Sequence, residues 1–366
     1  MKDTTCGGAS AAFFKRRTSR PVKAGRVTIG GNAPVSVQSM TTFLASDVEN
    51  TVRQINALYD AGAEIVRFAV TNEKDARAIP EIKRQTKAAL VADVQFDWKL
   101  AVLSAECGVD KVRVNPGNIG AEENIRRVAE AVKHYGIPVR VGGNTGSIDK
   151  EYLQKYGVSA QALGESVLRD VSRFEKYGVN DIVISVKASS APLTVAAYRY
   201  VAGKCDYPLH LGVTEAGTEY RGVVKSSVGI GSLLLDGIGD TIRVSLSGDP
   251  VREVVAANAI LESVGLKTDF AEVVACPTCG RCMWDAVSMA KRVEELVADV
   301  RVPLKIAVMG CVVNGIGESQ EADLGIAGAK GGAALFSKGK VIKTVKQEDI
   351  EREFLALVKA EVEKRK

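Results

Sequence analysis

The chain has 366 residues, of which 46% are hydrophobic and 25% are charged, and its formal net charge is +5. This composition is typical of a folded globular protein and excludes an intrinsically disordered chain. No apolar run reaches the roughly 18 residues that a membrane-spanning helix needs. The mild positive charge does not favour general nucleic-acid binding. We therefore expect neither a membrane nor a nucleic acid among the partners.

The N-terminal segment is basic rather than hydrophobic. Its cations, Lys15, Arg16, Arg17 and Arg20, surround a very short apolar stretch at residues 11–14. That stretch is too short for the apolar region of a secretory signal. We therefore predict a cytoplasmic protein whose first residues form a solvated basic tail.

Eight short runs rich in β-branched residues recur through the first two thirds of the chain. They are residues 35–40, 64–70, 90–96, 111–115, 138–144, 181–187, 209–215 and 241–247. Most are separated by stretches with helical periodicity, clearest at residues 47–61, 121–135 and 250–264. This alternation predicts a TIM (β/α)8 barrel over residues 1–265. A doubly wound open sheet would show the same alternation.

Polar residues cluster in the carboxyl-terminal half of nearly every predicted strand, where barrel active sites form. Five of them are the cations Arg67, Arg113, Arg140, Lys187 and Arg243. Burying an unpaired charge is costly, so an anionic ligand, most simply phosphate or diphosphate, explains all five together. The alternative is that each faces outward or pairs with a carboxylate such as Glu64 or Asp93. His210, which opens the seventh run, is either a site residue or a core histidine.

Residues 266–366 indicate a smaller α/β domain. The pattern predicts a helix at 283–297, strands at 304–309, 324–328, 333–336 and 341–345, and a final helix from about residue 347. The last two strands would pair across the polar turn at residues 337–340.

Seven cysteines, an odd number, do not suggest a secreted disulfide framework. Cys276 and Cys279 form a C-x-x-C pair, and Cys311 follows a predicted strand in the glycine-rich loop 310–318. Thiolates at this spacing select zinc or an iron–sulfur cluster. We favour iron–sulfur because the second half supplies only one cysteine, although Cys282 could complete a zinc site.

These motifs resemble the 4-hydroxy-3-methylbut-2-enyl diphosphate synthase family over essentially the whole chain. The resemblance is carried by CPTCGR at 276–281 and MGCVVNGIGE at 309–318, and by barrel segments such as RVNPGN at 113–118 and LHLGVTEAG at 209–217. It implies a TIM barrel followed by a small α/β iron–sulfur domain. The implied reaction is reductive ring opening and dehydroxylation of 2-C-methyl-D-erythritol 2,4-cyclodiphosphate to (E)-4-hydroxy-3-methylbut-2-enyl diphosphate, a step of isoprenoid precursor biosynthesis.

The resemblance also implies a cofactor, partners and site residues. The ligands of a 4Fe–4S cluster would be Cys276, Cys279, Cys311 and Glu318. Flavodoxin or ferredoxin would deliver two electrons, in a homodimer in which the cluster of one subunit caps the barrel of the other. The implied diphosphate positions are Arg67, Arg113, Arg140, Asn144, Lys187, Arg243 and Ser245, to which we add His210 and Thr214 as substrate-binding candidates. Glu215 is our candidate proton donor to the departing hydroxyl, and Asn314 our candidate hydrogen-bonding partner of the reacting oxygen.

The chain departs from the family pattern beside the expected pocket. Gln95 stands where the family usually has histidine, and residues 41–46 and 141–146 are atypical. These differences leave room for a paralogue with a related diphosphate substrate. Two other classes compete. One is a zinc-stabilised barrel protein that binds a phosphorylated metabolite without redox chemistry, and the other is a barrel aldolase that uses Lys187 as a Schiff base.

Overall fold

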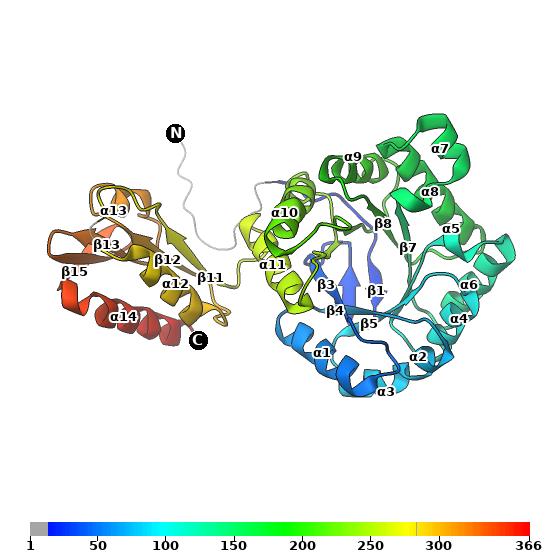
Figure 1. The fold of residues 1–366 in the computed structure, drawn as a ribbon, viewed down its shortest axis with the longest axis horizontal. Coiled ribbons are helices and arrows are strands. Elements are labelled where there is room, and N and C mark those ends of the chain that lie inside the picture. Colours follow the sequence, from blue (N-terminus) through cyan, green and yellow to red (C-terminus); the bar gives the residue numbers. More distant parts are fainter. Residues whose placement is uncertain (1–13, 283) are drawn as a thin grey trace. The chain divides into compact units, whose positions relative to one another are not determined.

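The computed structural model describes residues 14–282 and 284–366 (Figure 1). The chain divides into two compact units, Met1–Leu266 and Lys267–Lys366, each with a hydrophobic core of its own. None of the helices in the described part of the chain has the length and apolar character of a membrane span. Most of the apolar stretch 11–14, on which we judged the lack of a secretory signal, lies outside the described residues.

The first unit is a barrel of eight parallel strands (Figure 1). These are β3 (Ser36–Met40), β4 (Ile65–Ala69), β5 (Ala89–Val94), β6 (Lys111–Val114), β7 (Val139–Asn144), β8 (Ile182–Lys187), β9 (His210–Leu211) and β10 (Thr241–Ile242). The hydrogen-bonded order runs from β3 to β8 in sequence, and β10 pairs with both β3 and β9. A bridge between Ile184 and Leu209 completes the ring. The predicted TIM barrel is confirmed, and the open sheet is excluded.

Helices connect successive strands and cover the outside of the barrel (Figure 1). They are α1 (Val48–Asp60), α2 (Glu73–Arg77), α3 (Ile79–Gln85), α4 (Trp98–Glu106), α5 (Pro116–Ile119), α6 (Glu122–His134), α7 (Lys150–Tyr156), α8 (Ala160–Lys176), α9 (Ala191–Ala202), α10 (Glu219–Leu235) and α11 (Pro250–Ser263). Their apolar faces pack on outward-facing strand residues such as Val141 and Ile184 to form the main core. The side chains on the inner face of the barrel are therefore not part of this packing with the helices.

A hairpin that the sequence did not predict lies at the amino-terminal end of the barrel. β1 (Val22–Ala24) pairs antiparallel with β2 (Val27–Ile29). Its apolar side chains form a cluster with Ile65, Ala89, Val91 and Val183 from the barrel strands. The hairpin therefore covers the end of the barrel at which the strands begin.

The basic segment before this hairpin is not the solvated tail that we predicted. Arg16 donates to the carbonyl oxygen of Ala33 at 2.6 Å, and Arg17 donates to that of Cys205 at 2.7 Å. Both guanidinium groups also lie within 4 Å of the buried Asp240 carboxylate, at 3.4 and 3.8 Å. The prediction was wrong because these arginines find acceptors across the barrel that are far away in the sequence.

The second unit is a five-stranded mixed sheet. Its strands, in spatial order, are β11 (Ala271–Ala275), β12 (Leu304–Met309), β13 (Leu324–Ala329), β14 (Gly332–Ser337) and β15 (Lys340–Lys346). The first three are parallel and the last two are added as antiparallel neighbours. The predicted strands and the β14–β15 hairpin are confirmed, whereas β11 was missed.

Helices cover this sheet. α12 (Ala286–Val297) and α14 (Ile350–Arg365) share one apolar core with the strands. The short helix α13 (Gly315–Glu318) contributes to a second, smaller apolar cluster with Met309 and Phe336. The final helix begins at Ile350 because a 3-10 turn occupies the three residues before it.

Candidate functional site

A polar cavity of about 190 Å³ lies at the carboxyl-terminal ends of the barrel strands. Eight of the nine predicted substrate-binding residues line it: Arg67, Arg113, Arg140, Asn144, Lys187, Thr214, Arg243 and Ser245. The remaining lining residues are Asp93, Gln95, Gly143 and Ser185. The strand ends therefore bring together the cations that the sequence singled out.

Asp93 is the pocket residue whose role sequence reasoning underestimated. Its carboxylate accepts a hydrogen bond from Arg113 Nη1 at 2.9 Å and lies 3.7 Å from Arg67 Nε. Gln95 Nε2 donates to both carboxylate oxygens, at 3.1 and 3.2 Å. Burial alone would raise the pKa of Asp93, but the surrounding arginines lower it to about 2. Asp93 is thus an anion that orients two pocket arginines.

A second buried carboxylate holds Arg243. Glu253, on α11, accepts from Arg243 Nε at 3.3 Å and from Nη2 at 3.4 Å. Glu253 also accepts from the backbone N–H of Leu246 at 2.9 Å and from the Ser39 hydroxyl at 3.2 Å. Part of our alternative reading was therefore correct, because some pocket cations pair with carboxylates while still lining the cavity.

The pocket remains strongly positive after these pairings. Five cations, Arg67, Arg113, Arg140, Lys187 and Arg243, line it. Within the described part of the chain, the buried carboxylates bonded to them are those of Asp93 and Glu253. Burial, together with the neighbouring Arg243 and Arg113, lowers the pKa of Arg67 to about 10, although Asp93 opposes this shift. Burial and repulsion from Arg140 and Arg243 likewise lower the pKa of Lys187. Such a site favours a ligand with several negative charges.

Gly142, within the segment 141–146, leaves room for a pocket arginine. A Cβ atom at Gly142 would lie 2.8 Å from Ser185 Oγ and 3.4 Å from Arg113 Nε, so a larger residue there would displace them. Asn144 then caps the 3-10 turn that follows β7, accepting from the backbone N–H of Gly146 at 3.0 Å. Gly142 therefore keeps the space that Ser185 and Arg113 occupy beside the pocket.

Two predicted residues lie outside the lining. His210 is fully buried inside the barrel, four residues before Thr214 on the same chain segment, and is not part of the cavity wall. Glu215 is exposed on the loop after β9, with a left-handed φ of 52°. It directly follows Thr214, which does line the pocket.

The predicted cluster ligands occupy one edge of the second unit. β11 and β12 are parallel neighbours, with Ala275 opposite Val308, so Cys276 and Gly310 follow at adjacent strand ends. The Gly310 N–H donates to Cys276 Sγ at 3.0 Å. A Cβ at Gly310 would lie 2.9 Å from Cys282 Sγ, so Cys282 also belongs to this edge.

Arg281 links the remaining predicted ligands. The thiols of Cys311 and Cys279 and the carboxylate of Glu318 together raise the pKa of Arg281. The backbone N–H groups of Val313 and Asn314, with Arg281, lower the pKa of Cys311, which favours the thiolate that binds metals. Asn314 itself is exposed immediately before α13.

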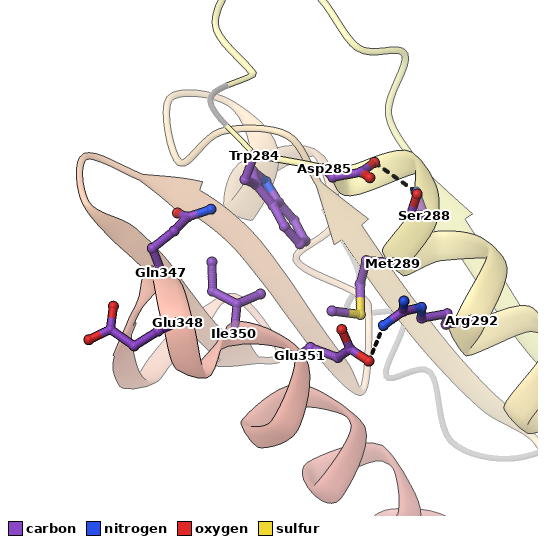
Figure 2. Close-up of a pocket in the computed structure, with 9 residues that line it drawn as sticks. All are labelled: Trp284, Asp285, Ser288, Met289, Arg292, Gln347, Glu348, Ile350 and Glu351. Atoms are coloured by element: carbon purple, nitrogen blue, oxygen red, sulfur yellow. Dashed lines mark hydrogen bonds and ion pairs between the residues drawn. The ribbon is translucent and has the colours of Figure 1, made fainter.

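Trp284 contacts the cysteine edge and also lines a separate pocket of the second unit. Its indole N–H donates to Met309 O at 3.3 Å, and its own carbonyl accepts from Cys282 Sγ at 3.2 Å. Figure 2 shows the indole facing Ile350 and Met289 in that pocket, beside the ion pair of Arg292 with Glu351. The indole ring of Trp284 therefore presents an apolar surface to this pocket.

The described thiols are free to bind a metal group. The cysteines outside the N-terminal residues are all free, so none is committed to a disulfide. Among the described residues, no three His, Cys, Asp or Glu side chains converge as a single-ion site. A 4Fe–4S cluster is held at four separate irons, so its ligands do not need to meet at one point. Two of the predicted thiol ligands and the predicted carboxylate ligand lie around Arg281, and their chemistry suits such a group.

The fold and the two sites define a class: a TIM-barrel protein with a polyanion pocket, joined to a domain whose cysteines can hold a metal cluster. The chain belongs to the GcpE family, because residues 19–258 match the GcpE TIM-barrel domain and residues 272–360 match the GcpE protein C-terminal domain. The resemblance inferred from the motifs is thereby confirmed.

Curated relatives are similar over nearly their full length. The chain is 52% identical over 341 residues to the 4-hydroxy-3-methylbut-2-en-1-yl diphosphate synthase (flavodoxin) of Caldanaerobacter subterraneus subsp. tengcongensis, covering 93% of this chain and 96% of the relative. It is 49% identical over 343 residues to the enzyme of the same name from Ruminiclostridium cellulolyticum, covering 93% and 97%. A type I 3-dehydroquinate dehydratase from Clostridium difficile is similar in structure, with a TM-score of 0.51 and 13% identity over 68% of this chain and 98% of that chain. The last likeness concerns the barrel fold alone.

Proposed function

We propose that this chain catalyses the reductive ring opening and dehydroxylation of 2-C-methyl-D-erythritol 2,4-cyclodiphosphate to (E)-4-hydroxy-3-methylbut-2-enyl diphosphate. The observation that carries the proposal is the five-cation pocket at the barrel mouth, in a chain about half identical to synthases of this name. In the reaction, the ring C–O bond to the diphosphate and the C–OH bond break, and a C=C bond forms. Two electrons enter, and the hydroxyl leaves as water after accepting a proton.

The pocket binds and holds the diphosphate in this proposal. Arg113 and Arg243 are oriented by the buried carboxylates of Asp93 and Glu253, so their remaining N–H groups are available to phosphate oxygens. Guanidinium groups held in place lose little freedom on binding. The same cations stabilise the charge that develops on the diphosphate oxygen as the ring opens.

The cysteine edge would hold the electron-transfer group. We assign Cys276, Cys279, Cys311 and Glu318 as ligands of a 4Fe–4S cluster, with Cys282 beside them as a bystander. When bound, this cluster supplies the two electrons one at a time. The names of the relatives support flavodoxin as the donor, with ferredoxin as the alternative. We also propose that the protein acts in the cytoplasm, as a homodimer whose two subunits share each active site.

Glu215 is proposed to move the proton and Asn314 to hydrogen-bond the reacting oxygen. Glu215 follows Thr214 of the pocket wall, and its exposed carboxylate can exchange protons with water. Glu215→Gln should abolish turnover while leaving iron content and pyrophosphate binding unchanged. The exposed Glu219→Gln on α10 serves as the matched control. Unchanged turnover in Glu215→Gln would remove Glu215 from the mechanism.

The decisive experiment is anaerobic purification followed by iron, sulfide and zinc analysis and a turnover assay with reduced flavodoxin. About four irons and four sulfides per chain are expected for a 4Fe–4S cluster. Turnover of the cyclodiphosphate should accompany them. Stoichiometric zinc without sulfide, even after anaerobic reconstitution, would favour a zinc-stabilised binding protein. A full cluster that turns over only a different diphosphate would identify a paralogue.

A further inference from the structure

The interior of the barrel beneath the substrate pocket is partly polar. TIM-barrel interiors are usually filled by layers of branched apolar side chains. Here, three polar side chains lie two or four residues before a residue of the cavity wall on the same chain segment: Lys111, His210 and Thr241. Ser36, which pairs with Thr241, and Gln38 on the same strand are also buried. Since alternate residues of a strand share a face, these side chains point into the same interior, one or two layers deeper.

The strand registers support this placement. Lys111 precedes Arg113 by two residues, and Arg113 is paired with Arg140. On the opposite side of the barrel, Thr241 is paired with His210 on one neighbour and with Ser36 on the other. Paired residues in adjacent strands project on the same side of the sheet. We call the group Lys111, Arg140, His210 and Thr241 the floor layer.

The floor layer is buried without protein partners. Lys111, His210 and Thr241 are 0% exposed, and Arg140 is 1% exposed. Lys111 Nζ, both ring nitrogens of His210, and Nε and Nη1 of Arg140 have no hydrogen-bond partner within the described part of the chain. Leaving buried donors unpaired costs folding free energy, so unpaired groups concentrated in one place require an explanation.

Nearby carboxylates are committed to other groups. Asp110, next to Lys111, accepts from Lys83 at 2.7 Å and from the Leu90 N–H at 2.8 Å. Asp93 serves Arg113 and Arg67 in the pocket above. Burial and mutual repulsion lower the pKa of Lys111 and of His210.

Loss of a proton from Lys111 or His210 does not remove all of the buried positive charge in the floor layer. A lysine or histidine can become neutral, but an arginine in a protein stays charged. Arg140 therefore contributes a buried positive charge whose Nε and Nη1 donors lack an acceptor.

We propose that the floor layer is a binding site for a small monovalent inorganic anion of the chloride class, distinct from the diphosphate pocket. The anion would accept hydrogen bonds from Lys111 Nζ and from Nε and Nη1 of Arg140, and from His210 when a ring N–H faces it. The hairpin β1–β2 packs against the barrel strands below, which restricts the occupant to a small ion. Arg140 is shared, because it also lines the substrate pocket. The proposal is independent of the reaction assigned above.

Bromide, which replaces chloride and scatters anomalously, gives the direct test. Crystals of the whole chain grown in bromide and saturating pyrophosphate should show an anomalous peak between Lys111 and Arg140. Pyrophosphate occupies the upper pocket, so that bromide there does not confuse the result. Peaks confined to the upper pocket or the surface, or a floor layer occupied only by water, would overturn the proposal.

A solution measurement uses Lys111→Met, which removes the charge and keeps an unbranched side chain. The wild type should gain several degrees in Tm as chloride replaces gluconate at constant ionic strength with saturating pyrophosphate, and the gain should saturate. Lys111→Met should lose this dependence, whereas Lys87→Met, which removes an exposed lysine outside the floor layer, should keep it. Equal chloride dependence in wild type and Lys111→Met would overturn the proposal. If Lys111→Met does not fold, the bromide experiment on the wild type still decides.

Discussion

Asp93→Asn tests whether the buried carboxylate of the pocket is ionised and stabilises the barrel. Asp93 lies between Arg113 and Arg67 with its side chain 5% exposed, and its pKa falls from 3.8 to about 2. At about 1.36 kcal/mol per pKa unit, this corresponds to about 2 kcal/mol of stability at pH 7. Removing one partner of a buried ion pair costs about 3–5 kcal/mol in general. We therefore expect Asp93→Asn to lower the free energy of unfolding by about 2–5 kcal/mol.

The pH dependence has a definite sign. The folded state binds the Asp93 proton more weakly than the unfolded state does, so this stabilisation is fully present above about pH 5 and is lost as the pH falls through about 2. About half of it should be gone at pH 3. The difference between wild type and Asp93→Asn should narrow accordingly as the solution is acidified.

Urea unfolding measures both quantities. In a Trp284→Phe background, Trp98 on α4 is the only tryptophan left, so its fluorescence reports on the first unit. Asp60→Asn, at an exposed position at the end of α1, is the matched control. A cost for Asp93→Asn no larger than that of the control would refute the reasoning. So would a difference that stays constant from pH 7 to pH 3.

Three further predictions concern the two sites. Arg243→Met should weaken pyrophosphate binding by roughly 10- to 100-fold in isothermal titration, since a charge-assisted hydrogen bond contributes about 1.5–3 kcal/mol. The exposed Arg221→Met should not change the affinity, and an unaffected Arg243→Met would exclude this residue from binding. Cys311→Ser should lose the visible absorbance and acid-labile sulfide of anaerobically purified protein, and Cys282→Ser should keep both; the opposite result would exchange their assignments. Mixed dimers of Arg243→Met and Cys311→Ser subunits should recover turnover if the sites are shared, and no recovery in verified hybrids would contradict a shared site.

The sequence predicts some barrel strands better than others. β3 to β8 lie within two residues of their predicted bounds, because each is a short, largely buried run that contains Val or Ile. β9 and β10 were predicted at seven residues each, at 209–215 and 241–247, yet only His210–Leu211 and Thr241–Ile242 are strand. Of the residues that follow them, Thr214, Arg243 and Ser245 line the pocket. Side chains of the site therefore occupy positions where the sequence predicted regular strand.

The sequence is sufficient to predict the cations of the pocket, but not the residues that hold those cations in position. The five cations are recognisable because a barrel strand should not carry them, and all five line the cavity. Glu253 could not be recognised as their partner, because it lies on α11 and looks like any helical glutamate. The β1–β2 hairpin was missed for a related reason. Its three-residue strands carry too little periodicity to be recognised before the barrel is built.

The supports of the pocket arginines also explain how the site stays positive. If a carboxylate oriented each arginine, the pairs would neutralise the pocket and weaken its attraction for a diphosphate. Met40 provides a neutral alternative. Its sulfur accepts from Arg67 Nε and Nη2, at 3.2 and 2.9 Å, and lies 3.6 Å from Arg243 Nη1. A thioether is a weak acceptor without charge, so it orients the two guanidinium groups and leaves their charge for the ligand. Asp93 and Glu253 fix the outer sides of the same arginines, and the pocket keeps both its geometry and its excess of positive charge.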